Sequence, residues 1–368
     1  MFELKQVTTP AAVKEFHAVA ALVYQNDPQY IQPLTADIEE IFDRSKNEAY
    51  NGGDAIRWVL TENGKLLGRV AAFYQTKNSG EKMGGMGFFD CVNRKEVAFA
   101  LFDQAQNWLK VQGLGYMDGP VNFGDRDSFW GLLVEMKSYS SYREAYHPAY
   151  YRAFFEEYGF EKIIEQKTCD ISEKEFNFER VSKLAGRVMA NSKYHFKTLD
   201  YGKIEQFADD FMRIYNEAWA HHEDFRPLTR EKMLQRLKKV KPVMPGEFVI
   251  FAYSEDRPIG FYINILEVNQ VFKYFGGKLS AWNMLRFLWM RGKINKLRGI
   301  VFGVVPDFQN LGIETGLIME FYKKVKANPR IEKAELAWIG DFNAKMLSML
   351  ESLGAYTTKV HYTYRKNF

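Results

Sequence analysis

The hydrophobic and polar positions of the first half predict an ordered series of strands and helices. Segments that alternate between apolar and polar residues are typical of strands, and apolar residues three or four positions apart are typical of helices. Asn63-Gly64, between two such alternating segments, predicts a hairpin. The predicted strands are residues 2–7, 56–61, 66–74, 86–92, 116–122 and a segment from 163, and the predicted helices are residues 10–24, 35–44, 95–112 and 148–158.

The same order of elements begins again after a helical segment at residues 172–189. The predicted strands of the second half are residues 195–199, 248–253, 259–268, 299–305, 334–338 and 356–364, and the helices are residues 204–221, 230–239, 278–291, 313–326 and 343–353. Both halves follow β-α-α-β-β-(β)-α-β-α-β, which predicts the α/β (α+β) class with mixed sheets. We predict an N-terminal domain at residues 1–171, a connector helix at 172–190 and a C-terminal domain at 191–368.

Composition narrows the class of protein. A length of 368 residues suits two domains, and a net charge of +4 is small for a dedicated nucleic-acid binder, so we expect no nucleic-acid partner. Only Cys91 and Cys169 are present, and the N-terminus lacks the pattern of a signal peptide, so we expect a cytoplasmic location. The densest apolar stretch, residues 281–290, contains Arg286 and is too short for a membrane span. Oligomeric state is not predicted.

Chemistry is most evident where the strand at 299–305 meets the helix at 313–326. The free N–H groups of the turn and the positive end of the helix dipole point to one place, which favours a phosphate group. Gly312 allows close approach of a ligand to the backbone. The alternative is an ordinary turn between a strand and a helix. The predicted ligand-binding residues are Val304, Val305, Gln309, Asn310, Leu311, Gly312, Ile313 and Glu314.

Val304-Val305-Pro306 with Gln309-x-x-Gly312 resembles the acetyl-CoA pyrophosphate loop of the GCN5-related N-acyltransferase (GNAT) superfamily. Glu314 departs from the pattern, in which a small residue is usual. Asn343-Ala344 followed by Leu353-Gly354 resembles the second motif of that family, whose Asn and short helix line the CoA arm. The resemblance implies two tandem GNAT-like folds, acetyl-CoA or another acyl-CoA as co-substrate, no metal, and Asn343 as a further CoA-binding residue.

In the first half the resemblance is weaker. Residues 90–98 contain no glycine where the loop should lie, although Arg94 and Lys95 could meet an anion. We therefore interpret the N-terminal copy as degenerate for CoA binding.

The resemblance also implies acyl transfer to an amine, for which a base, a polarising strand amide and a proton donor are expected. The family's usual tyrosine position is occupied by Leu350 in the second half and by Phe155 in the first. Glu267 and Asp341 are the candidate bases, and each is also explained as a solvated carboxylate.

Residues 123–147 form an irregular stretch that combines charged and aromatic side chains, which is typical of a site where a small ligand is oriented. The candidate substrate-binding residues are Asp125, Arg126, Trp130 and Tyr146. A packed loop that covers the sheet is an equally good interpretation.

Two other features have structural explanations. His221-His222-Glu223-Asp224 suits a helix end better than a metal site, because adjacent helical residues point in different directions. The helix at 278–291 is apolar nearly all round, which predicts burial between domains, with a wall for an apolar substrate or contact with a membrane surface as alternatives.

The leading functional hypothesis is an acyl-CoA-dependent N-acyltransferase acting on a small amine or amino-acid-like acceptor. A non-catalytic protein that binds acyl-CoA or another metabolite is one alternative. An aminoacyl-tRNA-dependent transferase is another, although it would require a concentrated basic surface. Fold alone does not decide among them.

Overall fold

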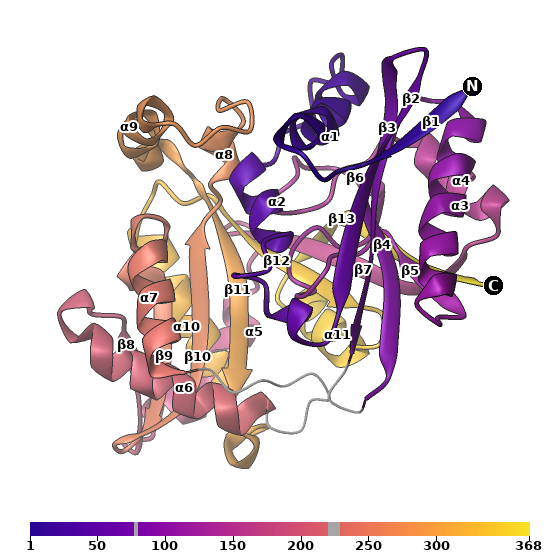
Figure 1. Ribbon diagram of the computed structural model, residues 1–368. Helices are drawn as coiled ribbons and strands as arrows, with labels where there is room; N and C mark the ends of the chain where they lie inside the picture. The colour runs from indigo at the N-terminus through magenta and orange to yellow at the C-terminus, as the bar shows by residue number, and fades with distance from the viewer. Residues whose placement is uncertain (77–79, 220–228) are drawn as a thin grey trace.

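The computed structural model describes residues 1–76, 80–219 and 229–368 (Figure 1). The predicted His221–Asp224 feature lies outside these residues. The elements of the first half are β1 (Phe2–Gln6), α1 (Pro10–Val23), α2 (Thr35–Ile41), β2 (Asp54–Glu62), β3 (Lys65–Thr76), β4 (Lys82–Cys91), α3 (Lys95–Val111), β5 (Tyr116–Gly119), β6 (Leu132–Met136), α4 (Tyr150–Tyr158) and β7 (Glu161–Ser172). Those of the second half are α5 (Phe178–Ala190), β8 (Tyr194–Thr198), α6 (Ile204–Trp219), α7 (Arg230–Val240), β9 (Val249–Ser254), β10 (Arg257–Leu266), α8 (Asn269–Phe272), α9 (Ala281–Met290), β11 (Lys296–Val304), α10 (Ile313–Ala327), β12 (Lys333–Gly340), α11 (Ala344–Ser352) and β13 (Tyr356–Asn367).

Local sequence explains where several elements begin and end. Thr9 accepts a hydrogen bond from the N–H of Ala12, which caps α1 ahead of Pro10. The β2–β3 hairpin turns at Asn63 and Gly64, both with positive φ. Gly159, with a φ of 90°, ends α4.

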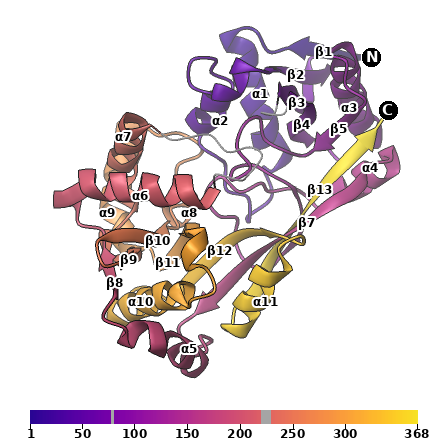
Figure 2. The same ribbon diagram turned by 90° about the horizontal axis from the view of Figure 1, so that it is seen from below.

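The strands form a single mixed sheet with the order β1-β2-β3-β4-β5-β13-β7-β12-β11-β10-β9-β8. The last strand of each half lies in the other half's part of the sheet: β13 pairs with β5, and β7 pairs with β12. β7 and β13 also pair with each other, antiparallel, from Tyr356–Asp170 to Arg365–Glu161. Figure 2 shows the two strands running together between the halves. Because of this exchange, β13 belongs to the second half in sequence but lies beside the first half in space. The domain boundaries at residues 171 and 191 therefore stay predictions.

A buried ionic network crosses the region of exchange. Lys359 of β13 donates to Glu144 and Glu335, at 2.6 and 3.0 Å. Lys296 of β11 donates to Glu335 and Asp170, at 2.6 and 3.0 Å. Burial opposes charge on Lys359, but the two carboxylates hold its pKa above the usual range. The network joins residues of the loop before α4 to four strands.

Two expectations about the elements are corrected. The irregular stretch at 123–147 contains β6, which pairs with β13 at Leu132–Tyr362. The helix predicted to be buried, α9, buries Phe287 and packs the partly buried Met290 against the core, whereas Trp282 and Trp289 are 74% and 73% exposed.

Candidate active site

β11 and β12 are paired as parallel neighbours only at their beginnings. The ladder runs from Lys296–Lys333 to Gly299–Leu336. The two strands then continue to Val304 and Gly340 without pairing to each other, while β11 stays paired with β10 and β12 with β7. A pair of parallel strands that separates in this way leaves backbone N–H and C=O groups facing the gap. The gap is therefore a place where a ligand can bind to the backbone.

An extra residue in β11 lies at the start of this gap. The pairing with β10 passes from Asn264–Gly299 to Ile263–Val301, so Ile300 has no partner across the ladder. A bulge of this kind bends the strand and releases a backbone group from the ladder. The bulge explains why the strands diverge after Gly299.

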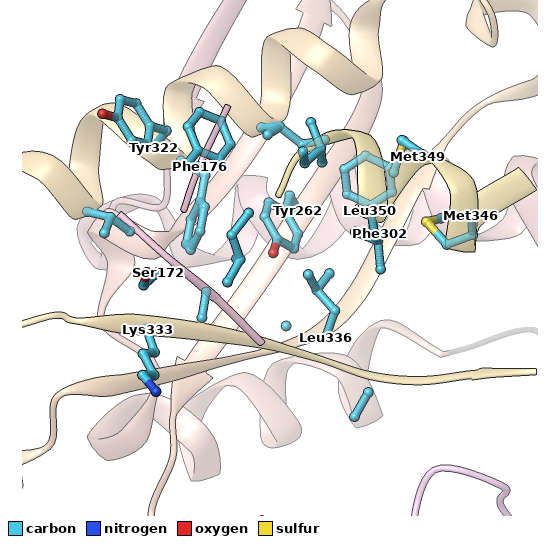
Figure 3. A pocket seen from close by; sticks show the side chains of 18 of the residues that line it. Ser172, Phe176, Tyr262, Phe302, Tyr322, Lys333, Leu336, Met346, Met349 and Leu350 are labelled. Atoms are coloured by element: carbon cyan, nitrogen blue, oxygen red, sulfur yellow. The ribbon is translucent and has the colours of Figure 1, made fainter. Parts of the chain in front are cut away.

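An apolar cavity of about 170 Å³ lies on the side of the gap covered by α10 and α11 (Figure 3). Phe176 and Tyr322 lie at one end, and Met346 and Met349 lie at the other. Leu350, at the family's usual tyrosine position, is buried and forms part of the wall. A mainly apolar lining of this kind favours hydrocarbon groups.

Tyr262 of β10 brings a hydroxyl group to this cavity. Its ring packs against Gly299, where an added Cβ would lie 3.2 Å from Tyr262 Cε2. Burial raises the pKa of the phenol, so the group is protonated at neutral pH. Among the described residues, no protein group forms a hydrogen bond with this hydroxyl. No sequence signal distinguishes Tyr262 from the other apolar residues of its strand.

A polar pocket lies on the opposite face of the sheet. Along β12, Ala334 and Leu336 line the apolar cavity, whereas Glu335 between them accepts a hydrogen bond from Ser141 at 2.7 Å. Since successive strand residues point to opposite faces, the loop at 123–147 and the cavity lie on different sides of β12. The polar pocket has a volume of about 10 Å³ and is lined by Arg126, Asp127, Phe129, Trp130, Arg143, Glu144, Gln166, Arg298, Ala337, Trp338 and His361.

Ala337 lines both spaces, so the apolar cavity and the polar pocket meet at this residue. The neighbouring Trp338 donates from its indole N–H to the carbonyl of Arg126 at 2.9 Å, which holds the loop against β12. Trp130 donates to Thr363 of β13 at 3.0 Å, which fixes the other side of the loop.

Asp127 and His361 are two titratable groups of the polar pocket, and the pKa of each is shifted from its usual value. Burial by the surrounding loop, and then the charge of Asp125, raise the pKa of Asp127, while Arg298 opposes the shift. Asp127 is nevertheless an exposed residue, so solvent reaches its side chain. Burial lowers the pKa of His361, whose Nε2–H donates to the carbonyl of Ala145 at 3.0 Å. Asp127 can therefore accept a proton from a group entering the pocket.

The predicted pyrophosphate loop contains the expected turn, but several of its residues contact the protein and are not free to contact a ligand. Val305 donates its N–H to Ile259, Gln309 donates its side-chain amide to the carbonyl of Val304, and Ile313 is fully buried. Among the described residues, the N–H groups of Leu311 and Gly312 donate to no protein group. The unpaired donors available to an anion are therefore those of residues 311 and 312 and the first turn of α10.

Gly312 is explained by packing as well as by conformation. Its φ is 88°, and an added Cβ would lie 3.0 Å from Val188 Cγ2 on α5. The connector helix therefore lies directly against the loop. It carries Lys183 and Arg187 as exposed cations.

The two motifs of the second half meet in space. Lys345, in the first turn of α11, donates to the side-chain oxygen of Asn310 at 3.0 Å. Asn343 caps α11 by accepting from the N–H of Met346 at 3.2 Å. Glu314 accepts a weak hydrogen bond from the N–H of Asn310 at 3.4 Å, which occupies one donor that an anion could use. Lys345 was not among the predicted residues.

The other predicted site residues lie apart. Glu267 is buried, and its Oε1 accepts from the N–H groups of Tyr142 and Asn269, so it caps a turn rather than facing the pocket. Asp341 is exposed and accepts from the N–H of Glu165 at 3.3 Å. Neither lines the cavity or the pocket.

Of the four substrate candidates, only Arg126 and Trp130 line the polar pocket. Asp125 accepts from the N–H of Asp127 at 3.1 Å and shapes the loop. Tyr146 donates to Asp27 at 2.5 Å and lies among other tyrosines.

In the first half, the cations at the start of α3 are already paired. Arg94 contacts Glu62 and Glu96, and Lys95 contacts Glu157 at 2.5 Å. Across the residues that the structure describes, no group of His, Cys, Asp and Glu could hold a metal ion. None of the helices searched in that same part of the chain is long and apolar enough to cross a membrane.

The chain is similar in sequence to two curated bacterial proteins. It is 26% identical over 370 residues to protein YghO of Escherichia coli (strain K12), covering 96% of this chain and 92% of that protein. It is 23% identical over 378 residues to the bacterial ceramide synthase of Caulobacter vibrioides, covering 98% and 96%. No protein-family model matches the chain.

Solved structures resemble the whole chain at low sequence identity. A tandem GNAT protein from the clavulanic acid biosynthesis pathway superposes with a TM-score of 0.57 at 10% identity, covering 100% of this chain and 98% of that one. The GCN5-related glucosamine N-acetyltransferase region of a fungal multi-domain GH3 β-N-acetylglucosaminidase superposes with a TM-score of 0.59 at 12% identity, and the chain spans 38% of that protein. With the mixed sheet and the divergent β11–β12 pair, these likenesses confirm that the chain has the GNAT fold in a tandem arrangement.

Proposed function

We propose that this protein is an acyl-CoA-dependent N-acyltransferase that joins a long acyl chain to an amine. The observation that carries the proposal is the meeting of two chemically different spaces at Ala337, in the gap between β11 and β12. The apolar cavity suits the acyl chain, and the polar pocket suits the amine. The thioester carbon would lie between them, where β11 no longer pairs with β12.

The CoA part of the donor would lie along the unpaired donors of residues 311 and 312 and of the first turn of α10. Lys345 and the cations of α5 would balance the charge of its phosphates. This placement rests on the loop geometry and on the resemblance of its sequence.

The reaction forms a C–N bond and breaks the C–S bond of the thioester. An acceptor enters as an ammonium ion and gives one proton to Asp127, whose raised pKa suits it as a base. The free amine attacks the thioester carbon, and an N–H group of β11 near Ile300 stabilises the developing charge on oxygen. Tyr262 gives its proton to the leaving thiolate and recovers one from the acylated nitrogen through solvent.

The acceptor that we favour is an amine with an apolar chain. The apolar cavity and the exposed apolar side chains of α9 both suit lipid-like molecules. The similarity to a protein named ceramide synthase points in the same direction. The small amine or amino-acid-like acceptor expected from the sequence is the competing possibility.

A substrate panel tests the proposal. The full chain would be incubated with acetyl-CoA or palmitoyl-CoA and with either a sphingoid base or small amines, and N-acylated products would be measured by mass spectrometry. We expect product mainly from palmitoyl-CoA with the sphingoid base. Ala337→Leu should reduce turnover at least tenfold by filling the junction of the two spaces, while Ala100→Leu, at a half-buried position of α3, serves as its control.

A non-catalytic binding protein is the second candidate, and one observation favours it. The carboxylate of Glu314 lies at the loop where an anionic ligand should bind, which weakens the site for CoA. Binding of palmitoyl-CoA by calorimetry without product from any acceptor would support this candidate over the transferase.

A further inference from the structure

The surface of α8, α9 and their connecting segment is unusually apolar for an exposed region. It lies at the upper left of Figure 1, at the edge of the second half. Its exposed apolar side chains are Tyr274, Leu279, Trp282, Met284, Leu285, Leu288 and Trp289. We call these residues the α9 surface. Exposed apolar patches of this kind mark contacts with other molecules or with membranes.

The chain segment that carries this surface has charges of a single sign. Residues 268–306 contain no Asp or Glu. The cations near the α9 surface are Lys273, Lys278, Arg286, Arg291 and Lys293. In the part of the chain that the structure describes, none of these five forms an ion pair with a carboxylate. The surface would therefore be attracted to a negatively charged partner.

The aromatic and cationic side chains are also close to each other. Lys293 lies 4.6 Å from the centre of the Trp289 ring, and Arg286 lies 4.8 Å from that of Tyr274. Tryptophan and tyrosine prefer the boundary between hydrocarbon and water, and lysine and arginine next to them reach the phosphate groups of lipids. A protein partner would require a matching apolar surface, whereas a lipid bilayer provides apolar and anionic groups together.

We infer that the α9 surface docks on an anionic lipid bilayer, with α9 lying along the interface and the cations contacting lipid phosphates. The combination of an apolar helix face and surrounding cations is the arrangement that binds helices to membrane surfaces without spanning them. Trp282 and Trp289 would enter the region between the headgroups and the acyl chains.

The docking surface is connected to the polar pocket by a short series of aromatic contacts. Phe287 of α9 contacts Phe272 of α8 at 5.7 Å between ring centres, and Phe272 contacts Tyr142 at 5.6 Å. Arg143 and Glu144, the next residues, line the polar pocket. If the chain acts as proposed above, docking would place the acceptor side of the site near the membrane, so that an amine could enter from the lipid phase.

Vesicle binding tests the inference without any substrate. The full chain would be sedimented with vesicles of phosphatidylglycerol and phosphatidylcholine, and with vesicles of phosphatidylcholine alone. We expect binding to the anionic vesicles that is at least tenfold stronger and that falls as salt is raised. Trp282→Ala/Trp289→Ala and Lys278→Gln/Arg291→Gln/Lys293→Gln should each weaken binding at least tenfold and leave the thermal midpoint unchanged.

Matched variants separate a local effect from a general one. Val111→Ser/Phe178→Ala removes exposed apolar groups elsewhere, and Lys14→Gln/Lys110→Gln/Lys174→Gln removes the same number of exposed charges elsewhere. Both controls should bind like the parent chain. The inference is overturned if the parent stays in the supernatant, if the controls lose as much binding as the α9 variants, or if the parent is a dimer that Trp282→Ala/Trp289→Ala dissociates.

The docking and the enzymatic proposal fail separately. If the parent chain does not bind vesicles but acylates a substrate dispersed in detergent, the membrane inference alone is rejected. If the parent chain binds vesicles but forms no product from any acyl donor, the transferase proposal alone is rejected.

Discussion

Lys359 Nζ lies 3.0 Å from Glu335 Oε2, although β13 and β12, which carry these residues, are separated in the sheet by β7. Both side chains are fully buried. Replacing Lys359 with Met would leave the carboxylates of Glu144 and Glu335 without their shared cation. We expect a loss of about 3 to 5 kcal/mol in the free energy of unfolding, measured by urea titration.

Lys162→Met is the control for that substitution, because Lys162 is exposed and forms its ion pair with Glu165, three residues away. It should change the free energy of unfolding by less than about 1 kcal/mol. Equal effects of the two substitutions would show that the buried network does not stabilise the joined sheet.

The contacts of Glu39 in α2 indicate that the free energy of unfolding decreases in acid. Hydrogen bonds from His17 and Arg57 outweigh partial burial and lower the pKa of Glu39 from 4.5 to about 2. Because the folded pKa is depressed, the stabilisation is fully present above about pH 4.5 and is lost as the pH falls toward 2. It should amount to about 1 to 2 kcal/mol, since the side chain is partly exposed.

The measurement is the free energy of unfolding between pH 6 and 3 for the parent and for Glu39→Gln. The variant should be less stable at pH 6 and should approach the parent as the pH falls. Glu3→Gln, on exposed β1, serves as the control. A constant difference between Glu39→Gln and the parent over this range would contradict the assignment.

Tyr262→Phe tests the proton donor. The substitution keeps the ring that packs against Gly299 and removes only the hydroxyl group, so binding of acyl-CoA should be unchanged. We expect kcat to fall about 10²-fold, because a positioned proton donor contributes about that much. Tyr322→Phe, in the same cavity, should retain kcat. Reduced acyl-CoA affinity in Tyr262→Phe would indicate a binding role instead.

Asp127→Asn tests the base. We expect kcat/KM to fall by about 10² to 10⁴. In the parent, kcat/KM should rise with pH through a pKa above the usual range of aspartate, because burial and Asp125 favour the protonated form. Asp341→Asn should behave like the parent, since Asp341 lies outside both spaces. A parent-like pH profile in Asp127→Asn would reject Asp127 as the base.

Glu314→Ala tests the position of the CoA phosphates. Removal of the carboxylate frees the N–H of Asn310 and removes a negative charge from the loop, so calorimetry should show CoA binding strengthened about threefold to tenfold. Lys345→Ala should weaken binding by a similar factor. Glu320→Ala, farther along α10, should have no effect. Substitution of Gly312 would not give a clean test. An added Cβ would lie 3.0 Å from Val188 Cγ2, and φ is positive, so both stability and CoA binding would change.

Local patterns in the sequence were sufficient to predict most elements and the mixed α/β class, although they missed β6 and α8, and the tandem GNAT fold was predicted from the resemblance of the two motifs. Hairpin residues, caps and apolar spacing act within a few positions of each other, so Asn63-Gly64 and the turn before α10 could be recognised directly. The exchange of β7 and β13 could not be predicted, since the residues that pair lie nearly 200 positions apart, as with Tyr356 and Asp170. Alternating patterns identify a strand but not its neighbour.

The candidate site was predicted only in part for the same reason. Arg126 and Trp130 were recognised from the mixture of charged and aromatic residues around them. Tyr262 lies among the mainly apolar residues of β10, and only the structure places its ring beside Gly299 and its hydroxyl group at the cavity. Glu267 and Asp341 occupy strand ends, where a carboxylate can equally well satisfy nearby N–H groups.

The exchanged position of β13 has a consequence for synthesis on the ribosome. The first half can form β1 to β5 early, but its sheet remains incomplete until Tyr356–Asn367 emerges. At ordinary rates of translation the delay between β7 and β13 is roughly 10 to 40 s. Loss of β13 through a stop codon or a proteolytic cut before Tyr356 would therefore remove a strand from the middle of the sheet. β5 would keep only β4 as a neighbour and β7 only β12, and the two strand edges left open would promote aggregation.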